Sequence, residues 1–235
     1  MTKRVVITGM GIISPIGNDV PTFWKNLVDG VCGIDYIHDF PTDGLPVKIA
    51  GKIKDFHPEE HGMDKAFGRK QDRFTQYGVA AAYEAMNQAG LVSEGEGQNI
   101  DPFRLGVYVG SGIGGFEIQF RETVKMIEDP TGQWISPLFI PTMISNIAAG
   151  HIAIKHQAKG PCIDVVTACA TSTNNIGEAF RAIRHGYADA IIAGGCEGAT
   201  IPLGIAGFAN AKALSRAEDP KYASLPFNAN RGGFV

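Results

Sequence analysis

The sequence contains no apolar run that approaches the roughly 18 residues of a membrane-spanning helix. It also has little excess charge, since 21 Lys and Arg against 24 Asp and Glu give a net charge of −3. A basic face for nucleic acid is therefore not expected. The N-terminal residues lack the long apolar segment and cleavage site of a secretory signal. These absences predict a globular, cytoplasmic protein that binds neither membranes nor nucleic acid.

Cysteine is also scarce, and the four cysteines form none of the C-x-x-C pairs that are typical of metal sites. We therefore expect no metal ion, and free thiols in a reducing compartment. Glycine is abundant in contrast, with 30 glycines, many of them at the ends of apolar runs. Because glycine permits tight turns, this pattern predicts buried strands that lead directly into helices.

Short apolar segments alternate with segments of helical periodicity, which predicts an α/β fold with a buried sheet. Residues 31–67 are rich in Gly, Pro and Asp and predict an irregular segment, and residues 116–160 predict a long insertion. The charged residues 68–73 favour a solvated helix start over an anion site. We expect strands at 5–8, 105–109, 163–168 and 190–193, and helices at 20–30, 75–89 and 172–185.

Cys169 is the residue that most strongly indicates chemistry, because it lies where an apolar strand ends and a helix begins near Ser172. The free N–H groups and positive dipole of a helix N-terminus stabilise a thiolate, the nucleophilic form of cysteine. The same amides can hold the oxyanion that develops when a thioester is attacked. Cys32, Cys162 and Cys196 do not combine a strand end with a helix start. Packing as a small core residue is the alternative role for any free cysteine.

Two other sequence patterns indicate a function less strongly than Cys169 does. Residues 5–11 (VVITGMG) are similar to the first strand of a dinucleotide-binding fold, but Ser14 occupies the third glycine position and Pro15 follows it. His151 could pair with a cysteine, but a lone histidine on an apolar helix is most often structural. We assign no catalytic role to either pattern.

Four segments occur in one order along the chain: residues 5–17 (VVITGMGIISPIG), 110–115 (GSGIGG), 167–172 (TACATS) and 193–195 (AGG). Together they resemble the β-ketoacyl-acyl carrier protein synthases of the thiolase superfamily, in particular the synthases II of bacterial fatty-acid elongation. The resemblance implies a thiolase-like fold of α-β-α layers, with two similar halves that each hold a five-stranded sheet. Residues 1–235 then match the first half, and the second half is absent. An apolar run has just begun at the last residues, which also predicts a truncated sequence.

The resemblance implies a two-stage condensation. Cys169 would take a fatty acyl group from the phosphopantetheine thioester of an acyl carrier protein. Malonyl-acyl carrier protein would then lose CO₂, and the resulting carbanion would attack the acyl-cysteine. The substrates arrive on the carrier protein, so no bound cofactor is implied. Two histidines and a lysine complete the site in this family, and all three belong to the second half.

The resemblance also implies an acyl pocket and a homodimer. Ile113 and Phe208 match positions that line the pocket. Phe139 matches a position that the insertion contributes to the pocket of the neighbouring subunit. Ordinary core packing is the alternative role for all three residues.

The sequence departs from the family at Asn228 and Gly232, where the family usually carries aspartates. Two alternatives to a condensing synthase stay open, a thiolase-type acyltransferase and a condensing-enzyme subunit without catalytic activity. The presence of Cys169 argues against the second alternative.

Overall fold

The computed structural model describes residues 4–235. The chain forms two compact units, which are described separately. The first unit comprises the residues up to Gly11 together with His57–Gly198, and the second comprises Ile12–Phe56 together with Ala199–Val235.

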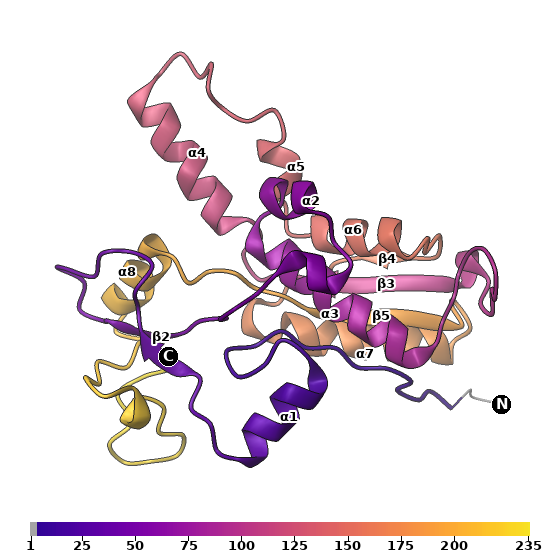
Figure 1. Cartoon of the computed structure of the whole chain (residues 1–235), viewed down its shortest axis with the longest axis horizontal. Helices are drawn as coiled ribbons and strands as arrows, with labels where there is room; N and C mark the ends of the chain where they lie inside the picture. The colour runs from indigo at the N-terminus through magenta and orange to yellow at the C-terminus, as the bar shows by residue number, and fades with distance from the viewer. Residues whose placement is uncertain (1–3) are drawn as a thin grey trace. The chain divides into compact units, whose positions relative to one another are not determined.

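The first unit is built on a parallel three-stranded sheet with the strand order β4-β3-β5 (Figure 1). The central strand β3 (Leu105–Gly110) is buried along its whole length. It pairs with β4 (Cys162–Ile163) on one side and with all six residues of β5 (Ala190–Gly195) on the other. Parallel strands need crossover connections, and helices supply them here.

Helices cover this sheet, and α6 and α7 both pack on β3. In Figure 1, α6 lies above the strands and α7 below them, while α3 packs along α6. The α-helices of this unit are α2 (Lys65–Lys70), α3 (Arg73–Ala89), α4 (Phe116–Glu128), α5 (Phe139–Met143), α6 (Ile147–Lys155) and α7 (Thr171–Arg184). Three short 3₁₀ helices accompany them, η1 (Pro58–His61), η2 (Pro102–Arg104) and η3 (Ala168–Ala170).

The helix expected at 75–89 is confirmed as α3, which begins two residues earlier than predicted. Asp72 caps its N-terminus, because the side chain accepts a hydrogen bond from the Phe74 N–H (3.3 Å). Gly90 ends the helix with a positive φ of 62°, a conformation that favours glycine. The expected strands at 105–109 and 190–193 are likewise confirmed as β3 and β5.

The strand expected at 5–8 does not form, and this prediction is wrong. β4 and β5 occupy the two edges of β3, and residues 5–8 pair with the outer edge of neither strand. The segment that follows packs against α3 instead. A Cβ at Gly9 or Gly11 would lie 2.1 or 1.9 Å from the carbonyl oxygen of Ala85 or Ala81, respectively.

The predicted strand before Cys169 is much shorter than expected, because only Cys162 and Ile163 form β4. Both residues are exposed, so the prediction of a buried strand is also wrong. Within the described residues β4 pairs only with β3 and is an edge strand. The five-stranded sheet implied by the resemblance is therefore a three-stranded sheet in residues 4–235.

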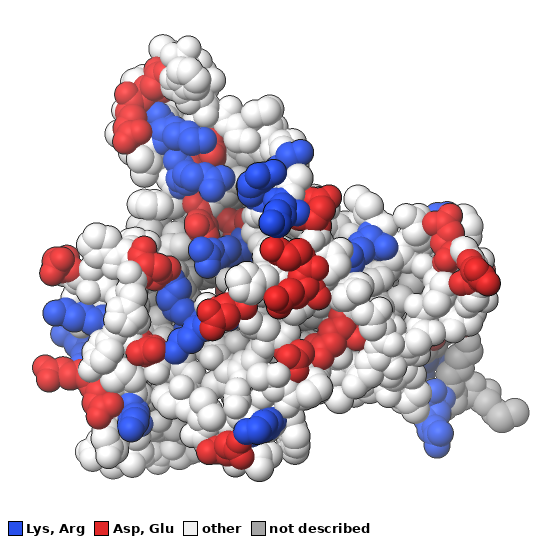
Figure 2. Space-filling view, viewed as in Figure 1, with Lys and Arg blue, Asp and Glu red and all other residues white. Residues whose placement is uncertain are grey.

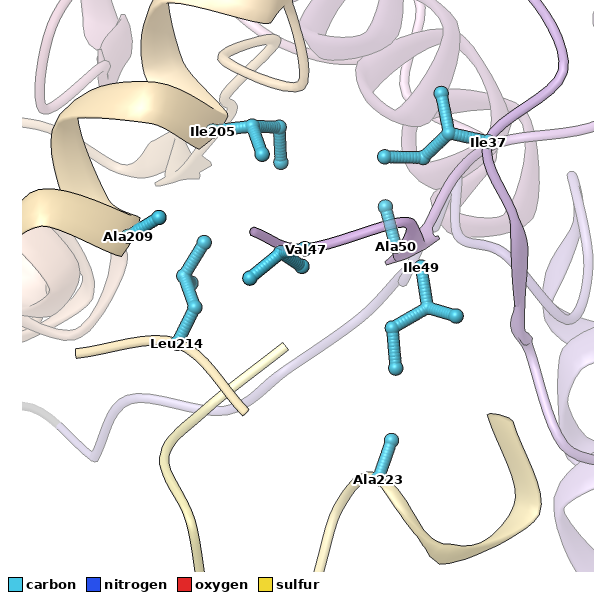
Figure 3. Packing of buried hydrophobic residues seen from close by; sticks show 8 residues of the cluster. All are labelled: Ile37, Val47, Ile49, Ala50, Ile205, Ala209, Leu214 and Ala223. Atoms are coloured by element: carbon cyan, nitrogen blue, oxygen red, sulfur yellow. The ribbon is translucent and has the colours of Figure 1, made fainter. Parts of the chain in front are cut away.

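The second unit contains α1 (Val20–Val28), the antiparallel strands β1 (Ile34–Tyr36) and β2 (Ile49–Gly51), α8 (Pro202–Asn210) and the 3₁₀ helix η4 (Pro220–Tyr222). The helix expected at 20–30 is thus confirmed as α1. The irregular segment expected at 31–67 does contain β1 and β2, whose three residues each are too few to show a periodic pattern. Figure 3 shows the core, formed by Ile37, Val47, Ile49, Ala50, Ile205, Ala209, Leu214 and Ala223.

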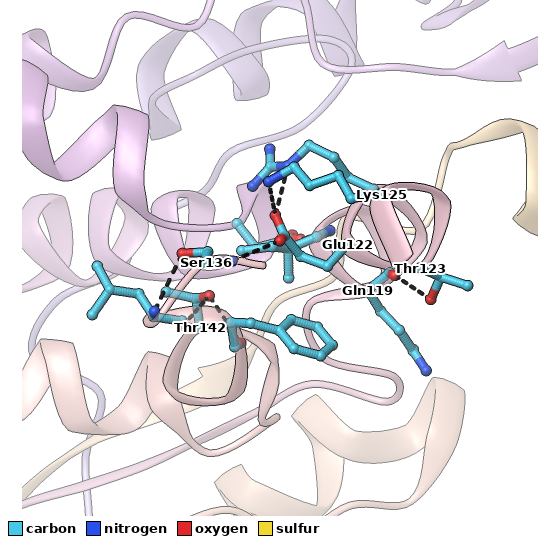
Figure 4. A network of polar contacts seen from close by, with 11 residues as sticks. Gln119, Glu122, Thr123, Lys125, Ser136 and Thr142 are labelled. Carbon is cyan, nitrogen blue, oxygen red and sulfur yellow. Dashed lines mark hydrogen bonds and ion pairs between the residues drawn. The ribbon is translucent and has the colours of Figure 1, made fainter. Parts of the chain in front are cut away.

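The predicted insertion at 116–160 holds α4, α5 and α6, and a buried carboxylate organises its first part (Figure 4). Glu122 is only 1% exposed and accepts hydrogen bonds from Lys125 Nζ (2.7 Å) and the Ser136 N–H (2.9 Å). Burial raises the pKa of Glu122, but these hydrogen bonds outweigh it and leave the pKa below its usual value. The carboxylate therefore fixes the loop after α4 to that helix.

Charged side chains of both signs occur on the surface. On the face shown in Figure 2, Lys and Arg gather over α2 and α4, and acidic side chains lie among and beside them. Within residues 4–235 no helix combines the length and the apolar character needed to cross a membrane.

Candidate active site

Cys169 is the middle residue of η3, which leads directly into the 14-residue helix α7. The helix expected to begin near Ser172 begins at Thr171. Cys169 is exposed. The structure therefore places an accessible thiol at the N-terminal end of a helix, where the predicted nucleophile requires it.

The turn that carries Cys169 is strained. Ala168 has a φ of 52°, in the left-handed region that residues other than glycine rarely adopt. Such a conformation costs about 1–3 kcal/mol and persists only where the surrounding structure holds it. Two side-chain contacts brace the turn, since the Thr167 N–H donates to Thr171 Oγ1 (2.9 Å) and Asn174 Nδ2 donates to Thr167 Oγ1 (2.6 Å).

Asn175 is completely buried and ties the segment before Cys169 to the helix after it. Its side chain accepts a hydrogen bond from the Val165 N–H (3.1 Å) and donates to the carbonyl oxygens of Val165 (3.2 Å) and Thr171 (2.9 Å). Because these bonds replace sheet pairing at Val165, they also explain why β4 stops early. Sequence reasoning missed this residue; a polar side chain four positions after Thr171, on the buried face of the helix, is its signal.

Residues 110–115, hereafter the glycine loop, pass close to other backbone as the sequence predicts. A Cβ at Gly112 would lie 3.3 Å from both the Cα and the carbonyl oxygen of Ala168. A Cβ at Gly115 would lie 2.7 Å from the carbonyl oxygen of Thr142. The absence of side chains thus allows the loop to lie directly against the turn of Cys169 on one side and α5 on the other.

We expect Gly115→Ala to lower the free energy of unfolding by about 1–3 kcal/mol, because the new methyl group meets backbone that cannot rotate away. Urea denaturation measures this loss. Gly177→Ala is the matched control, since Gly177 lies inside α7 and a Cβ there would have nothing within 4 Å. The control should gain about 0.5–1 kcal/mol from helix propensity. Equal stability of the two variants would contradict the close approach.

Glu197 is a second residue that sequence reasoning missed. It follows β5 by two positions, and its carboxylate accepts hydrogen bonds from Ser111 Oγ (3.3 Å), the Ile113 N–H (3.2 Å) and the Gly198 N–H (3.1 Å). Glu197 is exposed as a residue, but desolvation of its carboxyl group raises the pKa of that group, and these hydrogen bonds offset part of the shift. An acidic residue two positions after a strand that ends in glycines is the signal that could have identified it.

The other cysteines differ from Cys169 in their surroundings. Burial raises the pKa of the Cys196 thiol well above its ordinary value, and the nearby carboxylates of Glu197 and Asp164 raise it further. Partial desolvation of the thiol also raises the pKa of Cys162, although the residue as a whole is exposed. Both thiols are therefore held in the protonated, unreactive form at neutral pH.

We expect Cys169 to be the first thiol modified by a limiting amount of iodoacetamide, because it is exposed and lies at a helix N-terminus. Peptide mapping by mass spectrometry measures the order of labelling. Cys32 is the critical comparison, since it is also exposed but lies outside any helix. Labelling of Cys32 ahead of Cys169 would contradict the prediction.

The three predicted pocket residues lie in different places. Ile113 belongs to the glycine loop of the first unit and is 45% exposed. Phe208 lies in α8 of the second unit, where its ring meets Phe234 edge to face with the ring centroids 5.4 Å apart. Phe139 is the first residue of α5 and is partly buried. Their role in an acyl pocket stays a prediction.

His151, left without a catalytic role, lies in α6 and packs edge to face on the ring of Phe67, with 5.0 Å between the ring centroids. Burial lowers the pKa of His151, which keeps its ring neutral. Within residues 4–235, no group of three or more His, Cys, Asp or Glu side chains could hold a metal ion.

Comparison with known proteins decides the family. A family model described as "Beta-ketoacyl synthase, N-terminal domain" matches residues 2–235. The chain belongs to the β-ketoacyl synthase family. It is 47% identical to 3-oxoacyl-[acyl-carrier-protein] synthase 2 of Staphylococcus aureus (strain COL) and 44% identical to the protein of that name from Vibrio cholerae. In both comparisons 99% of this chain is matched to 55% of the relative, so the chain spans about half the length of these β-ketoacyl synthases.

Solved structures of β-ketoacyl synthases share the fold. A beta-ketoacyl synthase from Burkholderia phymatum STM815 matches with a TM-score of 0.85 at 28% identity, over 100% of this chain and 56% of that one. The ketosynthase of AntDE:AntF, a type II PKS acyl-carrier protein in complex with its ketosynthase, matches with a TM-score of 0.82 at 26% identity. That match covers 100% of this chain and 56% of the other. The thiolase-like α/β fold expected from the sequence is therefore confirmed.

Proposed function

We propose that the protein is a condensing enzyme that elongates fatty acyl chains by decarboxylative condensation with malonyl-acyl carrier protein. Membership of the β-ketoacyl synthase family and the names of the relatives support this function. The single observation that carries it is the exposed Cys169 at the N-terminus of α7. A non-catalytic subunit would have no need for a thiol in this position.

The thiolate of Cys169 attacks the carbonyl carbon of the acyl thioester. A bond forms between Sγ and that carbon, the bond to the phosphopantetheine sulfur breaks, and the carrier leaves as a thiolate that takes up a proton from water. Malonyl-acyl carrier protein then loses CO₂, and the electron pair released forms the carbon–carbon bond to the acyl-cysteine. The bond to Sγ breaks, which returns the thiolate and gives the β-ketoacyl product. The Cys169 N–H serves as one donor to the oxyanion.

Residues 1–235 form the first of two similar halves, and the second half contributes two histidines and a lysine. The coverage of about half of each relative supports this division. Exposed apolar side chains on one face of α7, Ile176 (50%) and Phe180 (43%), provide a surface that the second half can cover. They lie four residues apart and therefore on the same face of the helix.

An acyl carrier protein and a second copy of the chain are the proposed partners. The AntDE:AntF structure shows such a carrier in complex with a related ketosynthase. The segment from α4 to α5 exposes Ile127 (74%), Trp134 (68%) and Ile140 (56%), which supports a homodimer contact that includes Phe139. The free state of all four cysteines supports a cytoplasmic location.

Incubation of the intact protein with acyl-acyl carrier protein, followed by mass spectrometry, tests the proposed function. The expected result is one added acyl group on the peptide that contains Cys169, and a β-ketoacyl product after malonyl-acyl carrier protein is added. An acyl group on Cys162 alone, or no acylation, would contradict the proposal.

Ile113→Phe in the intact protein should shorten the longest acyl chain that is accepted, because the larger ring narrows the predicted pocket. Transfer of short chains should stay nearly unchanged. Rates with a series of acyl-carrier substrates measure the effect, and Ile113→Val is the control that keeps the pocket open. An equal loss for all chain lengths would indicate a folding defect instead.

A further inference from the structure

We propose that Glu197 is a positioning residue, whose carboxylate holds the glycine loop against the turn that carries Cys169. The inference rests on the proposed function, since it concerns the transfer of an acyl group to that cysteine. It concerns residues of the first unit only. Glu197 touches neither the thiol nor the acyl group and acts through the backbone between them.

The sheet of the first unit holds the backbone next to Glu197 rigidly. Glu197 follows β5, whose six residues pair in register with β3, so that Gly195 lies opposite Gly110. The Cys196 N–H extends this pairing with a hydrogen bond to the carbonyl oxygen of Gly110 (2.9 Å). Glu197 and the start of the glycine loop are therefore fixed side by side by the sheet itself.

From this fixed position the Glu197 carboxylate binds the glycine loop at two points. It accepts hydrogen bonds from Ser111 Oγ (3.3 Å) and the Ile113 N–H (3.2 Å). Ser111 is completely buried. Its Oγ also accepts a hydrogen bond from the Gly114 N–H (2.8 Å), which links a third residue of the loop to this network. Removal of the carboxylate would leave the buried hydroxyl and the Ile113 amide without this acceptor.

The loop transmits this restraint to the nucleophile through Gly112. A Cβ at Gly112 would lie 3.3 Å from Glu197 Oε2 and 3.3 Å from both the Cα and the carbonyl oxygen of Ala168. The carboxylate and the strained residue before Cys169 therefore both lie against the side of Gly112 where a side chain would project. An alanine keeps the left-handed backbone conformation only where the surrounding residues hold it. Movement of the glycine loop would therefore let the turn relax, and the side chain and backbone N–H of Cys169 would shift.

Hydrogen–deuterium exchange of the intact protein tests this coupling without reference to activity. Glu197→Gln keeps the size of the side chain but replaces one acceptor oxygen by a donor. We expect exchange to become about tenfold faster in residues 110–115 and also in 165–170, while residues 105–109 of β3 do not change. Ser111→Ala should act in the same direction. Ser93→Ala is the matched control, because Ser93 is also buried but donates to the carbonyl oxygen of His156 instead.

Faster exchange that is confined to 110–115 would overturn the proposal, since Glu197 would then hold the loop without positioning the turn of Cys169. Faster exchange throughout the first unit would also overturn it, because that result indicates general destabilisation. These outcomes are independent of whether the protein is a condensing enzyme.

A kinetic comparison separates positioning from thiol reactivity. Acyl transfer needs both the thiol and an aligned oxyanion donor, whereas alkylation by iodoacetamide needs only the thiol. In Glu197→Gln we expect acyl transfer to Cys169 to fall about 10- to 100-fold while its alkylation is nearly unchanged and Cys196 stays unlabelled. An equal fall in both rates, or labelling of Cys196, would count against the proposal. If the unaltered protein takes no acyl group, the proposed function fails and the exchange experiment alone decides the role of Glu197.

Discussion

Cys169→Ala should reduce acyl transfer from acyl-acyl carrier protein by at least about 10³-fold, because the substitution removes the atom that forms the covalent bond. The fold should persist, since Cys169 is exposed and fills no part of the core. The rate of acyl-enzyme formation, followed by mass spectrometry of the intact protein, measures the loss.

Cys162→Ala provides the matched control, because Cys162 is an exposed cysteine on β4, only seven positions earlier. It should retain nearly the full rate of acyl transfer. Circular dichroism of both variants shows whether either substitution disturbs the fold. An acyl-enzyme in Cys169→Ala, or its loss in Cys162→Ala, would assign the nucleophile to a different residue.

Three helices, α1, α3 and α7, could be predicted because signals in the local sequence mark them. Asp19 caps α1 by accepting the Thr22 N–H (2.7 Å), and Gly90 ends α3 in the left-handed conformation. Both signals are carried by residues within one turn of the helix end. The buried strand β3 and the partly buried strand β5 could also be predicted, since each is a short apolar run that ends in glycine.

Strand pairing could not be predicted in the same way, because it depends on contacts between residues that are distant in the sequence. Residues 5–8 have a β-branched composition that favours a strand, yet they pair with no strand, and the segment that follows packs against α3. The extended segment before Cys169 leaves the sheet because Asn175 binds the backbone of Val165. That bond joins residues ten positions apart and has no periodic signature.

The candidate site also contains residues that the sequence could identify and residues that it could not. Cys169 could be identified from sequence because an apolar run, a cysteine and a helix start are adjacent in the chain, although the strand itself ends at Ile163. Glu197 and Ser111 are 86 positions apart, and only the pairing of β3 with β5 brings them together. Residues that hold a nucleophile in place are thus harder to find than the nucleophile, since their partners are distant in sequence.

In the 235-residue chain alone, iodoacetamide should still alkylate Cys169. The chain should form the β-ketoacyl product at least about 10³-fold more slowly than an intact condensing enzyme does. Decarboxylation generates a carbanion, and in the proposed function the second half supplies the histidines that stabilise it. The histidine that sequence reasoning considered, His151, is half-buried, neutral and packed on Phe67.

The assay is incubation of the purified chain with acyl- and malonyl-acyl carrier proteins, with detection of the β-ketoacyl product. Its control is alkylation of Cys169 while Cys196 stays unlabelled, because all four free cysteines would react in an unfolded chain. The bare apolar face of α7, with Ile176 and Phe180, should also make this chain poorly soluble. Turnover equal to that of an intact enzyme would contradict the prediction, and its loss in His151→Gln would then place the missing acid–base group within this chain. Because selective alkylation of Cys169 over Cys196 needs a folded chain whereas condensation needs both halves, the two measurements separate a folded but incomplete site from an unfolded chain.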